Sequence, residues 1–301
     1  MPQAEPVIIV GAGAIGSVYA AKLSARHPVT VVARRDHVEA IRAGGLRLVG
    51  IETLTARVAA VTSVDAIAPG TIVLLTTKVN ASEAALTPIA DLVRDDTVIV
   101  CVQNGLDSEG IARRAIRERC LVMRAITQFG AIFQSPGVIN FTRSGYTLLE
   151  DGPRSAAIAA MLTACGLDGR ISPDITTEIW RKLIFNCVIN PITSITGTDV
   201  GGIADQRLDP LKRLVIDECL AVARTQTVHF DIDFLPAITE IFGSSRNIAS
   251  MRQDLMRGRP TEIDHLNGAV VDLGRARGID CPVNAALTAI IKAMDRCTMA
   301  S

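Results

Sequence analysis

The chain has 301 residues, of which 49% are hydrophobic and 3% aromatic, and its 31 Lys and Arg balance its 31 Asp and Glu. The length exceeds one average domain, and the composition is that of an ordinary globular protein rather than a disordered chain. The zero net charge and the lack of a long basic run argue against nucleic acid or an anionic membrane as a partner.

Seven scattered cysteines without a C-x-x-C pair predict neither a disulfide framework nor a zinc site. We therefore expect no metal, reduced thiols and a cytoplasmic location. The first residues do not form a basic region followed by a removable apolar segment, and no run of about eighteen apolar residues predicts a membrane helix.

The first half of the chain alternates short β-branched runs with helical stretches, which predicts a parallel sheet covered by helices on both faces. The expected strands are 7–10, 29–32, 72–75 and 98–102, and the expected helices are 15–26, 36–43 and 107–118. Strand-like runs between 121 and 149 predict antiparallel hairpins that extend this sheet. A helix over 155–165 and a strand near Arg170 complete this half.

Beyond Ser172-Pro173-Asp174 the apolar residues recur every three or four positions, which is the period of amphipathic helices. The expected helices are 175–190, 210–229, 235–242, 248–257, 261–277 and 283–297. The pattern therefore predicts two domains, an α/β domain over residues 1–172 and an all-helical domain over residues 173–301.

The motif Gly11-Ala12-Gly13-Ala14-Ile15-Gly16 follows the first expected strand and opens the first expected helix. In a dinucleotide site, Gly11 permits the tight turn, Gly13 lets the backbone approach the pyrophosphate, and Gly16 lets the helix pack on the strand. The phosphates then lie on N–H groups at the positive end of the helix. A plain tight turn is the alternative, but the context favours a Rossmann-type doubly wound sheet.

The end of the second strand discriminates between the two nicotinamide cofactors. Val31-Val32-Ala33 is followed by Arg34-Arg35, where an Asp or Glu would bind the ribose 2′-hydroxyl. A guanidinium suits a 2′-phosphate, so we expect NADPH, with Arg34 ahead of Arg35 as its partner. The alternative is a solvated arginine pair, and Asp36 comes too late to be the usual acid.

Polar residues also follow two later strands, as Thr76-Thr77-Lys78 and Gln103-Asn104-Gly105. Both segments should project into the crevice at the carboxyl edge of the sheet. Taken alone, they are equally well explained as a solvated loop tip and as ordinary turn residues.

The helical half carries an unusual polar face. Lys182, Asn186 and Asn190 are spaced i, i+4 and i+8, so on a helix they share one face about 12 Å long. Their neighbours are apolar, and burying these side chains without partners would be costly, so a polar ligand is favoured over a solvent-facing stripe. Pro191 is expected to end or kink the helix just after Asn190.

Further along, Asn247 and Ser250 interrupt another mainly apolar region. Thr261 follows Gly258-Arg259-Pro260 and is expected to cap a helix, with Glu262 in its first turn. On spacing alone, Glu262 is better explained by a favourable interaction with the helix dipole than by catalysis.

In combination and in chain order, these motifs resemble the ketopantoate reductase (2-dehydropantoate 2-reductase) family. The matching segments are Gly11-x-Gly13-x-x-Gly16, Lys78, Gln103-Asn104-Gly105, Trp180-x-Lys182 with Asn186 and Asn190-Pro191, Ser250-Met251 with Gln253-Asp254, and Thr261-Glu262-Ile263-Asp264. Members of the family have an amino-terminal Rossmann domain, a helical domain like that of 6-phosphogluconate dehydrogenases, and an active site in the cleft between them.

The resemblance implies that Lys182 is the general acid and that Glu262 lies near it, the substrate and the cofactor. It places Asn104 where cofactor and substrate meet and Lys78 beside the nicotinamide, and by a looser match it places Ala131 at the cofactor. The residues that it implies for the hydroxyl and carboxylate of the substrate are Asn186, Asn190, Asn247 and Ser250. The implied reaction is the NADPH-dependent reduction of a 2-keto acid, with ketopantoate, a precursor in pantothenate biosynthesis, as the first candidate.

Two departures from the family pattern affect the substrate. Val200 stands where the family often has an asparagine, and Ala249-Ser250-Met251 keeps only the second serine of the usual Ser-Ser-Met. A related two-domain NADP-dependent dehydrogenase acting on another keto or hydroxy acid therefore remains an alternative, as does a non-catalytic NADPH sensor. Apolar helix faces in the second domain favour a homodimer.

Overall fold

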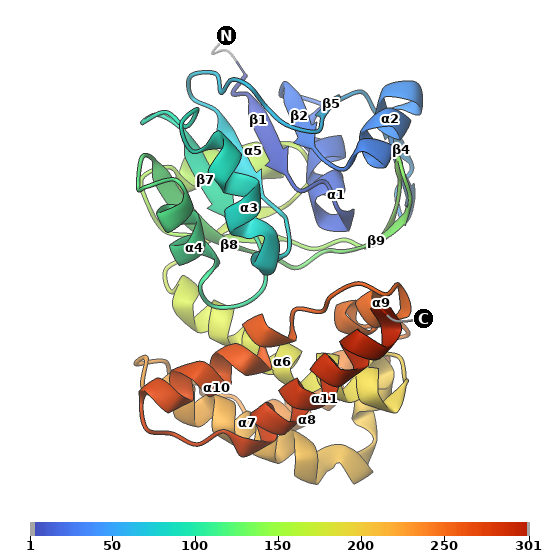
Figure 1. Cartoon of the computed structure of the whole chain (residues 1–301), viewed down its shortest axis with the longest axis vertical. Helices are drawn as coiled ribbons and strands as arrows, with labels where there is room; N and C mark the ends of the chain where they lie inside the picture. Colours follow the sequence, from blue (N-terminus) through green and yellow to red (C-terminus); the bar gives the residue numbers. More distant parts are fainter. Residues whose placement is uncertain (1–3, 300–301) are drawn as a thin grey trace. The chain divides into compact units, whose positions relative to one another are not determined.

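The computed structural model describes residues 4–299. The chain forms two compact units, each with its own core (Figure 1). Unit 1 comprises the residues up to Gln103 together with Asp107–Ile175, and unit 2 comprises Asn104–Leu106 together with the chain from Thr176 onward. The three-residue segment Asn104–Leu106 therefore belongs structurally to the helices that follow it much later in the sequence.

Unit 1 contains an eight-stranded sheet in the order β12-β11-β8-β7-β6-β1-β2-β5. Its strands are β1 (Val7–Val10), β2 (Val29–Val32), β5 (Ala59–Val61), β6 (Ile72–Leu75), β7 (Val98–Cys101), β8 (Leu121–Thr127), β11 (Thr147–Glu150) and β12 (Gly169–Ser172). The six strands from β8 to β5 are parallel, and β11 pairs antiparallel with β8. The predicted parallel sheet is confirmed.

Side chains of β1 alternate between the two faces of this sheet, and both faces are covered. Val7 and Ile9 pack with the apolar residues of α1 (Ala14–Leu23), α2 (Arg35–Gly44) and α5 (Ser155–Ala164). Ile8 and Val10 pack on the opposite face with α3 (Ser82–Leu86) and α4 (Ser108–Ala115). Burial on both faces explains why the central strands are uninterrupted apolar runs.

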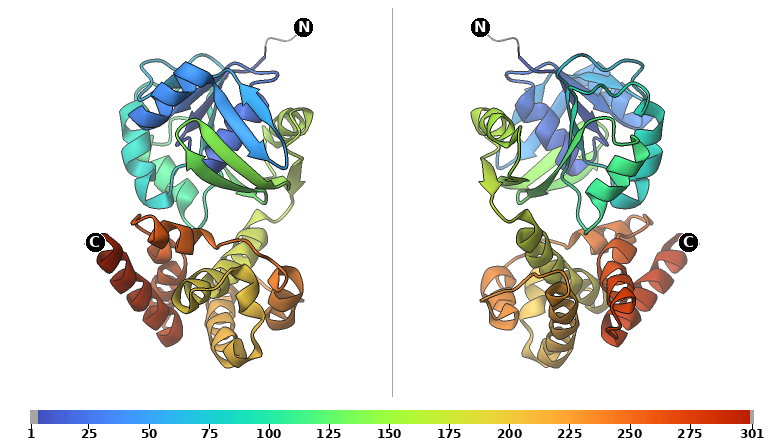
Figure 2. Two further views of the ribbon diagram at one scale, coloured as in Figure 1. Left: turned by 90° about the vertical axis from the view of Figure 1, so that its right-hand side faces the viewer. Right: turned by 90° about the vertical axis from the view of Figure 1, so that its left-hand side faces the viewer.

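The expectation that 121–149 would only extend the main sheet is wrong for its middle part. The hairpin of β9 (Gly130–Ser135) and β10 (Val138–Arg143) lies in a second sheet of order β4-β3-β10-β9, with β3 (Leu46–Gly50) and β4 (Leu54–Ala56) (Figure 2). β10 pairs in parallel with β3, about ninety residues earlier in the chain. This sheet packs on α1, which is why it is separate from the main one. The sequence pattern had not predicted β3, β4 or β5.

Unit 2 consists of α6 (Ile175–Thr196), η3 (Val200–Ala204), η4 (Gln206–Leu208), α7 (Asp209–Arg224), α8 (Phe234–Phe242), α9 (Ser250–Met256), η5 (Ile263–His265), α10 (Asn267–Ala276) and α11 (Pro282–Met299). The predicted α/β fold followed by a helical domain is confirmed. Among residues 4–299, no helix is both long and apolar enough to cross a bilayer.

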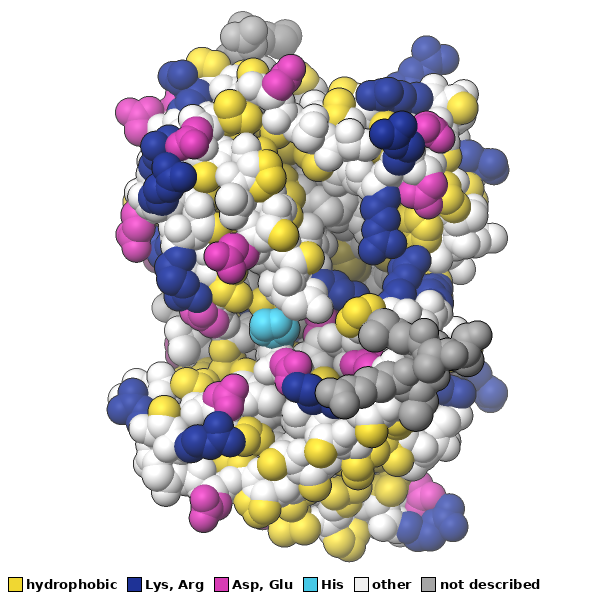
Figure 3. Space-filling view, in the orientation of Figure 1, with side chains coloured by type: hydrophobic (Ala, Val, Ile, Leu, Met, Phe, Trp, Pro, Cys, Tyr) yellow, Lys and Arg dark blue, Asp and Glu magenta, His cyan; other side chains and the backbone are white. Residues whose placement is uncertain are grey.

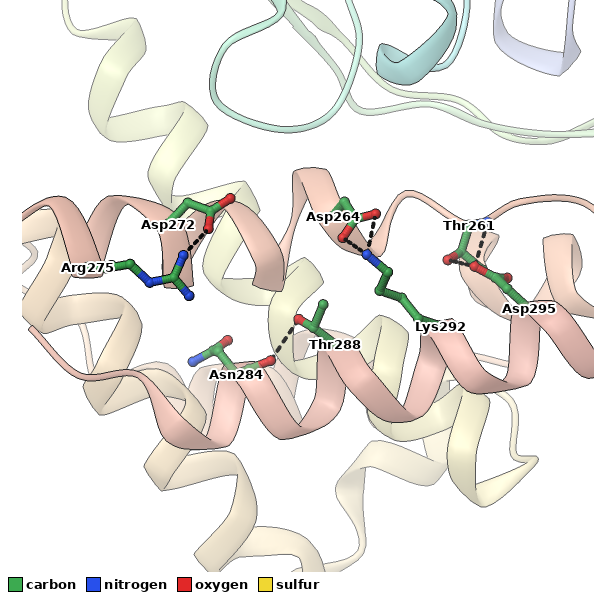
Figure 4. Close-up of polar contacts among 8 residues, drawn as sticks. All are labelled: Thr261, Asp264, Asp272, Arg275, Asn284, Thr288, Lys292 and Asp295. Carbon is green, nitrogen blue, oxygen red and sulfur yellow. Dashed lines mark hydrogen bonds and ion pairs between the residues drawn. The ribbon is translucent and has the colours of Figure 1, made fainter.

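Two details of unit 2 differ from the prediction. α6 does not end at Asn190 but continues through Pro191 to Thr196. The segment expected as one helix over 261–277 divides into η5 and α10, so Thr261 is not a helix cap. Its hydroxyl and backbone N–H instead donate to Asp295 Oδ2 on α11, at 2.8 and 3.3 Å (Figure 4).

Candidate active-site residues

The glycine turn between β1 and α1 has no room for side chains at its first and last glycine. Gly11 has a φ of 98°, and a Cβ there would lie 2.6 Å from the backbone nitrogen of Thr77. A Cβ at Gly16 would lie 2.6 Å from the carbonyl oxygen of Gly11. At Gly13 the closest atom would be 4.0 Å away, so its outer side is open. The turn is therefore tight on the protein side and accessible where a pyrophosphate would lie.

The start of α1 provides N–H groups for an anion. Ser17 N donates to Gly13 O at 3.0 Å, which is the first bond of the helix. The N–H groups of Ala14, Ile15 and Gly16 precede that bond and have no acceptor within the helix. They fit the phosphates of a dinucleotide at the positive end of the helix dipole.

Arg34 follows β2 beside this turn. The backbone N–H groups of Gly11 and Ala12 both donate to Val32 O, at 3.1 and 3.2 Å, which ties the turn to the carboxyl end of β2. Arg34 occupies the N-cap position of α2, and both it and Arg35 are exposed. Lys and Arg side chains gather over α2 and the neighbouring small sheet, which makes this side of unit 1 electropositive (Figure 3).

A buried histidine braces the same region, and the sequence reasoning missed it. The N–H of Gly137 donates to His37 Nδ1 at 2.9 Å, so Nε2 carries the proton and lies 3.3 Å from Ser17 Oγ. Ser17 Oγ in turn donates to Ala12 O at 3.2 Å. Burial lowers the pKa of His37, and the charge of Asp36 opposes this effect. The neutral ring thus links the β9–β10 turn to the glycine turn.

Gln103 holds together the ends of β6 and β7. Its Nε2 lies 3.0 Å from Thr77 O, 3.1 Å from Thr77 Oγ1 and 2.6 Å from Ser82 Oγ. Lys78 follows Thr77 at the N-cap of η1 (Val79–Ala81) and is half-buried. Ala131 lies in β9 opposite Phe141 and is also half-buried. A bracing role for Gln103 could not be distinguished from turn chemistry in the sequence.

Asn104 and Glu262 meet within unit 2. Asn104 Nδ2 donates to Glu262 Oε2 at 3.3 Å, and both side chains are half-buried. Gly105 has a φ of 87°, and a Cβ there would lie 2.8 Å from His265 O, so a glycine is needed for this close approach. Glu262 precedes η5 instead of lying in the first turn of a helix. The expected place of Glu262 in the first turn of one long helix over 261–277 is therefore wrong.

α6 presents the three predicted polar side chains on one face because the helix is continuous through all of them. Lys182 and Asn186 are half-buried, and Asn190 is only 5% exposed. The face is therefore not a solvated stripe but a set of polar groups beside the apolar core of unit 2.

Asn247 and Ser250 lie in and after the loop between α8 and α9, and both are exposed. The N–H of Val200 donates to Asn247 O at 2.8 Å, and Gly201 N donates to Ser245 O at 2.7 Å. The Val200 side chain belongs to the apolar core. Position 200 therefore holds the loop through its backbone, while its side chain offers no polar contact.

Comparison with known proteins matches both parts of the chain. The family model described as Ketopantoate reductase PanE/ApbA matches residues 7–154, and the model of its C-terminal domain matches residues 174–295. A 2-dehydropantoate 2-reductase of Pyrococcus horikoshii is 31% identical over 96% of this chain and 97% of its own length. The chain belongs to the ketopantoate reductase family.

Solved structures share the fold over nearly the full length of this chain. A PanE/ApbA family ketopantoate reductase from Ralstonia eutropha has a TM-score of 0.89 at 30% identity, covering 97% of this chain and 99% of that one. A D-mandelate dehydrogenase, solved with NADH and anilino(oxo)acetate, has the same TM-score at 26% identity and the same coverage. As a ketopantoate reductase family member, the chain is a nicotinamide-dependent oxidoreductase.

Proposed function

We propose that this enzyme uses NADPH to reduce the keto group of a small 2-keto acid, with ketopantoate as the first substrate and pantoate as the product. The observation that carries the proposal is the Asn104–Glu262 hydrogen bond at 3.3 Å. It lies within unit 2, and it links the segment that follows β7 in the sequence to the segment before η5; helix α6 of the same unit carries Lys182, Asn186 and Asn190 on one face. The proposal assigns the cofactor to unit 1 and the keto acid to unit 2.

The bound cofactor supplies the hydride. Negative charge then develops on the keto oxygen, and the ammonium of Lys182 stabilises this charge and donates the proton. Glu262 accepts the hydrogen bond of Asn104 and so fixes the orientation of that amide. Asn186 and Asn190 on α6, with Asn247 on the α8–α9 loop and Ser250 at the start of α9, hold the hydroxyl and carboxylate of the substrate. Their amide and hydroxyl groups are suited to these partners.

The preference for NADPH rests on Arg34. Its exposed guanidinium at the N-cap of α2 follows a strand end that carries no acidic residue before Asp36. A guanidinium can bind a 2′-phosphate through two parallel hydrogen bonds. The D-mandelate dehydrogenase relative was solved with NADH, so both cofactors belong in the assay.

The valine at position 200 makes the identity of the keto acid a question for experiment. Its side chain is 8% exposed and packs in the core of unit 2, so it adds no polar contact to the site. A substrate with a less polar group at that position than ketopantoate is therefore the second candidate. The D-mandelate dehydrogenase solved with anilino(oxo)acetate, an aromatic oxamate, supports including an aromatic 2-keto acid in the test.

An absorbance assay of NADPH oxidation tests the proposal. The purified protein is incubated with ketopantoate, with other aliphatic 2-keto acids and with benzoylformate, each with NADPH and with NADH. We expect turnover with at least one 2-keto acid and a higher kcat/KM with NADPH. Tight NADPH binding without turnover of any keto acid would instead indicate a sensor. A 3-keto acid is included as well, and turnover of that compound alone would indicate a different dehydrogenase.

A cytoplasmic location and a homodimer remain predictions. Exposed Leu214 and Ile241 on α7 and α8 supply apolar surface on unit 2, as a self-association interface would require. Sedimentation velocity at micromolar concentration measures the oligomeric state directly.

A further inference from the structure

Pro191 deprives one carbonyl of α6 of its helical partner. The proline lies inside the helix and has no N–H, so the carbonyl oxygen of Cys187, four residues earlier, lacks the i→i−4 bond that an ordinary residue at 191 would donate. Cys187 is 0% exposed, which puts its peptide group in the core of unit 2. A buried carbonyl in this position requires another donor.

Asn267 supplies that donor. Its Nδ2 donates to Cys187 O at 3.0 Å from the first residue of α10. The same nitrogen donates to Asn284 Oδ1 at 2.9 Å, so both of its N–H groups are used. Asn267 and Asn284 are both 0% exposed. Two acceptors on one side fix which way the Asn267 amide faces.

The network continues to α7 and α11, which hold the amide in place. Asn284 Nδ2 donates to Glu218 Oε2 at 2.7 Å. The Glu218 carboxylate also accepts the backbone N–H groups of Val283 and Asn284, each at 2.9 Å, at the start of α11. The donor to Cys187 is thus anchored by two other helices rather than by α6 itself.

The turn of α6 that lacks its backbone bond carries two of the proposed substrate-binding residues. Asn186 immediately precedes Cys187, and Asn190 immediately precedes Pro191. A proline ring inside a helix crowds the carbonyl four residues back and tends to kink the axis there. A shift of Cys187 O at this turn would therefore change the spacing between the two asparagine side chains. Lys182 lies about one turn earlier in α6.

We propose that Asn267 is a positioning residue for the keto acid. It replaces the N–H that Pro191 lacks, and so keeps α6 continuous and holds Asn186 and Asn190 at the separation that the substrate requires. This inference rests on the proposed function, because it assumes that these two asparagines bind the substrate.

A double-mutant cycle between Asn267 and Pro191 tests this role. Pro191→Ala restores an N–H at residue 191 that can reach Cys187 O, which makes the Asn267 bond dispensable. We expect Asn267→Ala to raise KM for the keto acid about tenfold while kcat changes less than about threefold, since Lys182 lies about one turn before the carbonyl that Asn267 holds. In the double variant, KM should return to within about threefold of the wild-type value.

Glu218→Gln is the matched control. It weakens the bonds of Glu218 at the start of α11 but leaves the bonds from Asn267 to Cys187 O and Asn284 Oδ1 in place, so it should lower Tm and leave KM nearly unchanged. If Asn267 had a purely structural role, Asn267→Ala would likewise lower Tm without changing KM. The Kd for NADPH should be unaltered in every variant, because the glycine turn lies in unit 1.

A wild-type KM in folded Asn267→Ala would overturn the inference, as would a double variant with no recovery of KM. If the wild-type protein reduces no keto acid at all, the proposed function is wrong. The Tm values of the wild type, Asn267→Ala, Pro191→Ala and the double variant then still decide whether Asn267 replaces the missing N–H. A smaller Tm loss from Asn267→Ala in the Pro191→Ala background supports the replacement, and equal losses refute it.

Discussion

Asn104 and Glu262 lie 158 positions apart in the sequence, yet their side chains share a hydrogen bond of 3.3 Å. Asn104 is held there because Gly105, with its φ of 87°, lets the backbone approach His265 closely. The first segment of unit 1 ends at Gln103. Asn104, the next residue in the sequence, already belongs to the helical unit.

Removing the Asn104 amide should therefore damage the reaction more than the fold. We expect Asn104→Ala to lower kcat/KM about tenfold to a hundredfold, as for loss of a hydrogen bond to a charged group, with a Tm change of only a few degrees. Steady-state kinetics and thermal unfolding measure the two effects. An unaltered kcat/KM would remove Asn104 from the site.

Lys182→Ala should abolish the proton donor. We expect kcat to fall about 10²- to 10⁴-fold, with Kd for NADPH nearly unchanged. The control is Lys292→Ala. The exposed Lys292 amine pairs at 2.9 Å with Asp264, which lies two residues after Glu262 in the sequence (Figure 4). Such an exposed pair contributes little to stability, so kcat should be preserved. Equal activity in the Lys182 variant and this control would contradict the assignment.

Arg34→Ala should shift the cofactor preference. Loss of a charge-assisted pair with a 2′-phosphate should raise KM for NADPH about tenfold to a hundredfold and leave KM for NADH nearly constant. Arg35→Ala is the matched comparison and should have the smaller effect. Parallel losses with both cofactors would mean that Arg34 supports the fold and does not read the 2′-phosphate.

His37 makes the stability of unit 1 depend on pH. Burial lowers its pKa below the ordinary value of 6.5. The unfolded chain therefore takes up this proton first on acidification, and stability is lost as the pH falls through 6.5 towards the folded pKa. Protonation also removes the acceptor for the Gly137 N–H.

Urea unfolding at about pH 7.5 and about pH 5.5 measures this dependence. In His37→Gln the loss between these two pH values should be smaller than in the wild type. If the loss is equal in both proteins, other groups cause it.

Local patterns in the sequence predicted much of the architecture. The central strands β1, β6 and β7 were recognisable because parallel strands buried on both faces are continuous apolar runs, and β2 was recognisable because its residues are all β-branched. The glycine turn and the helices of unit 2 were predicted on the same basis, since turn chemistry and helical periodicity act over a few residues. The spacing of Lys182, Asn186 and Asn190 likewise placed them on one face of α6.

Three features were decided only by the tertiary structure, because each depends on a partner that is remote in the sequence. β3 pairs with β10, so its identity as a strand comes from a neighbour in a different part of the chain. Pro191 would end an isolated helix, but Asn267 donates to Cys187 O and α6 continues. Glu262 meets Asn104 by the same kind of long-range contact. A sequence window reveals the donors and acceptors that a segment carries, whereas the folded chain determines which distant group satisfies them.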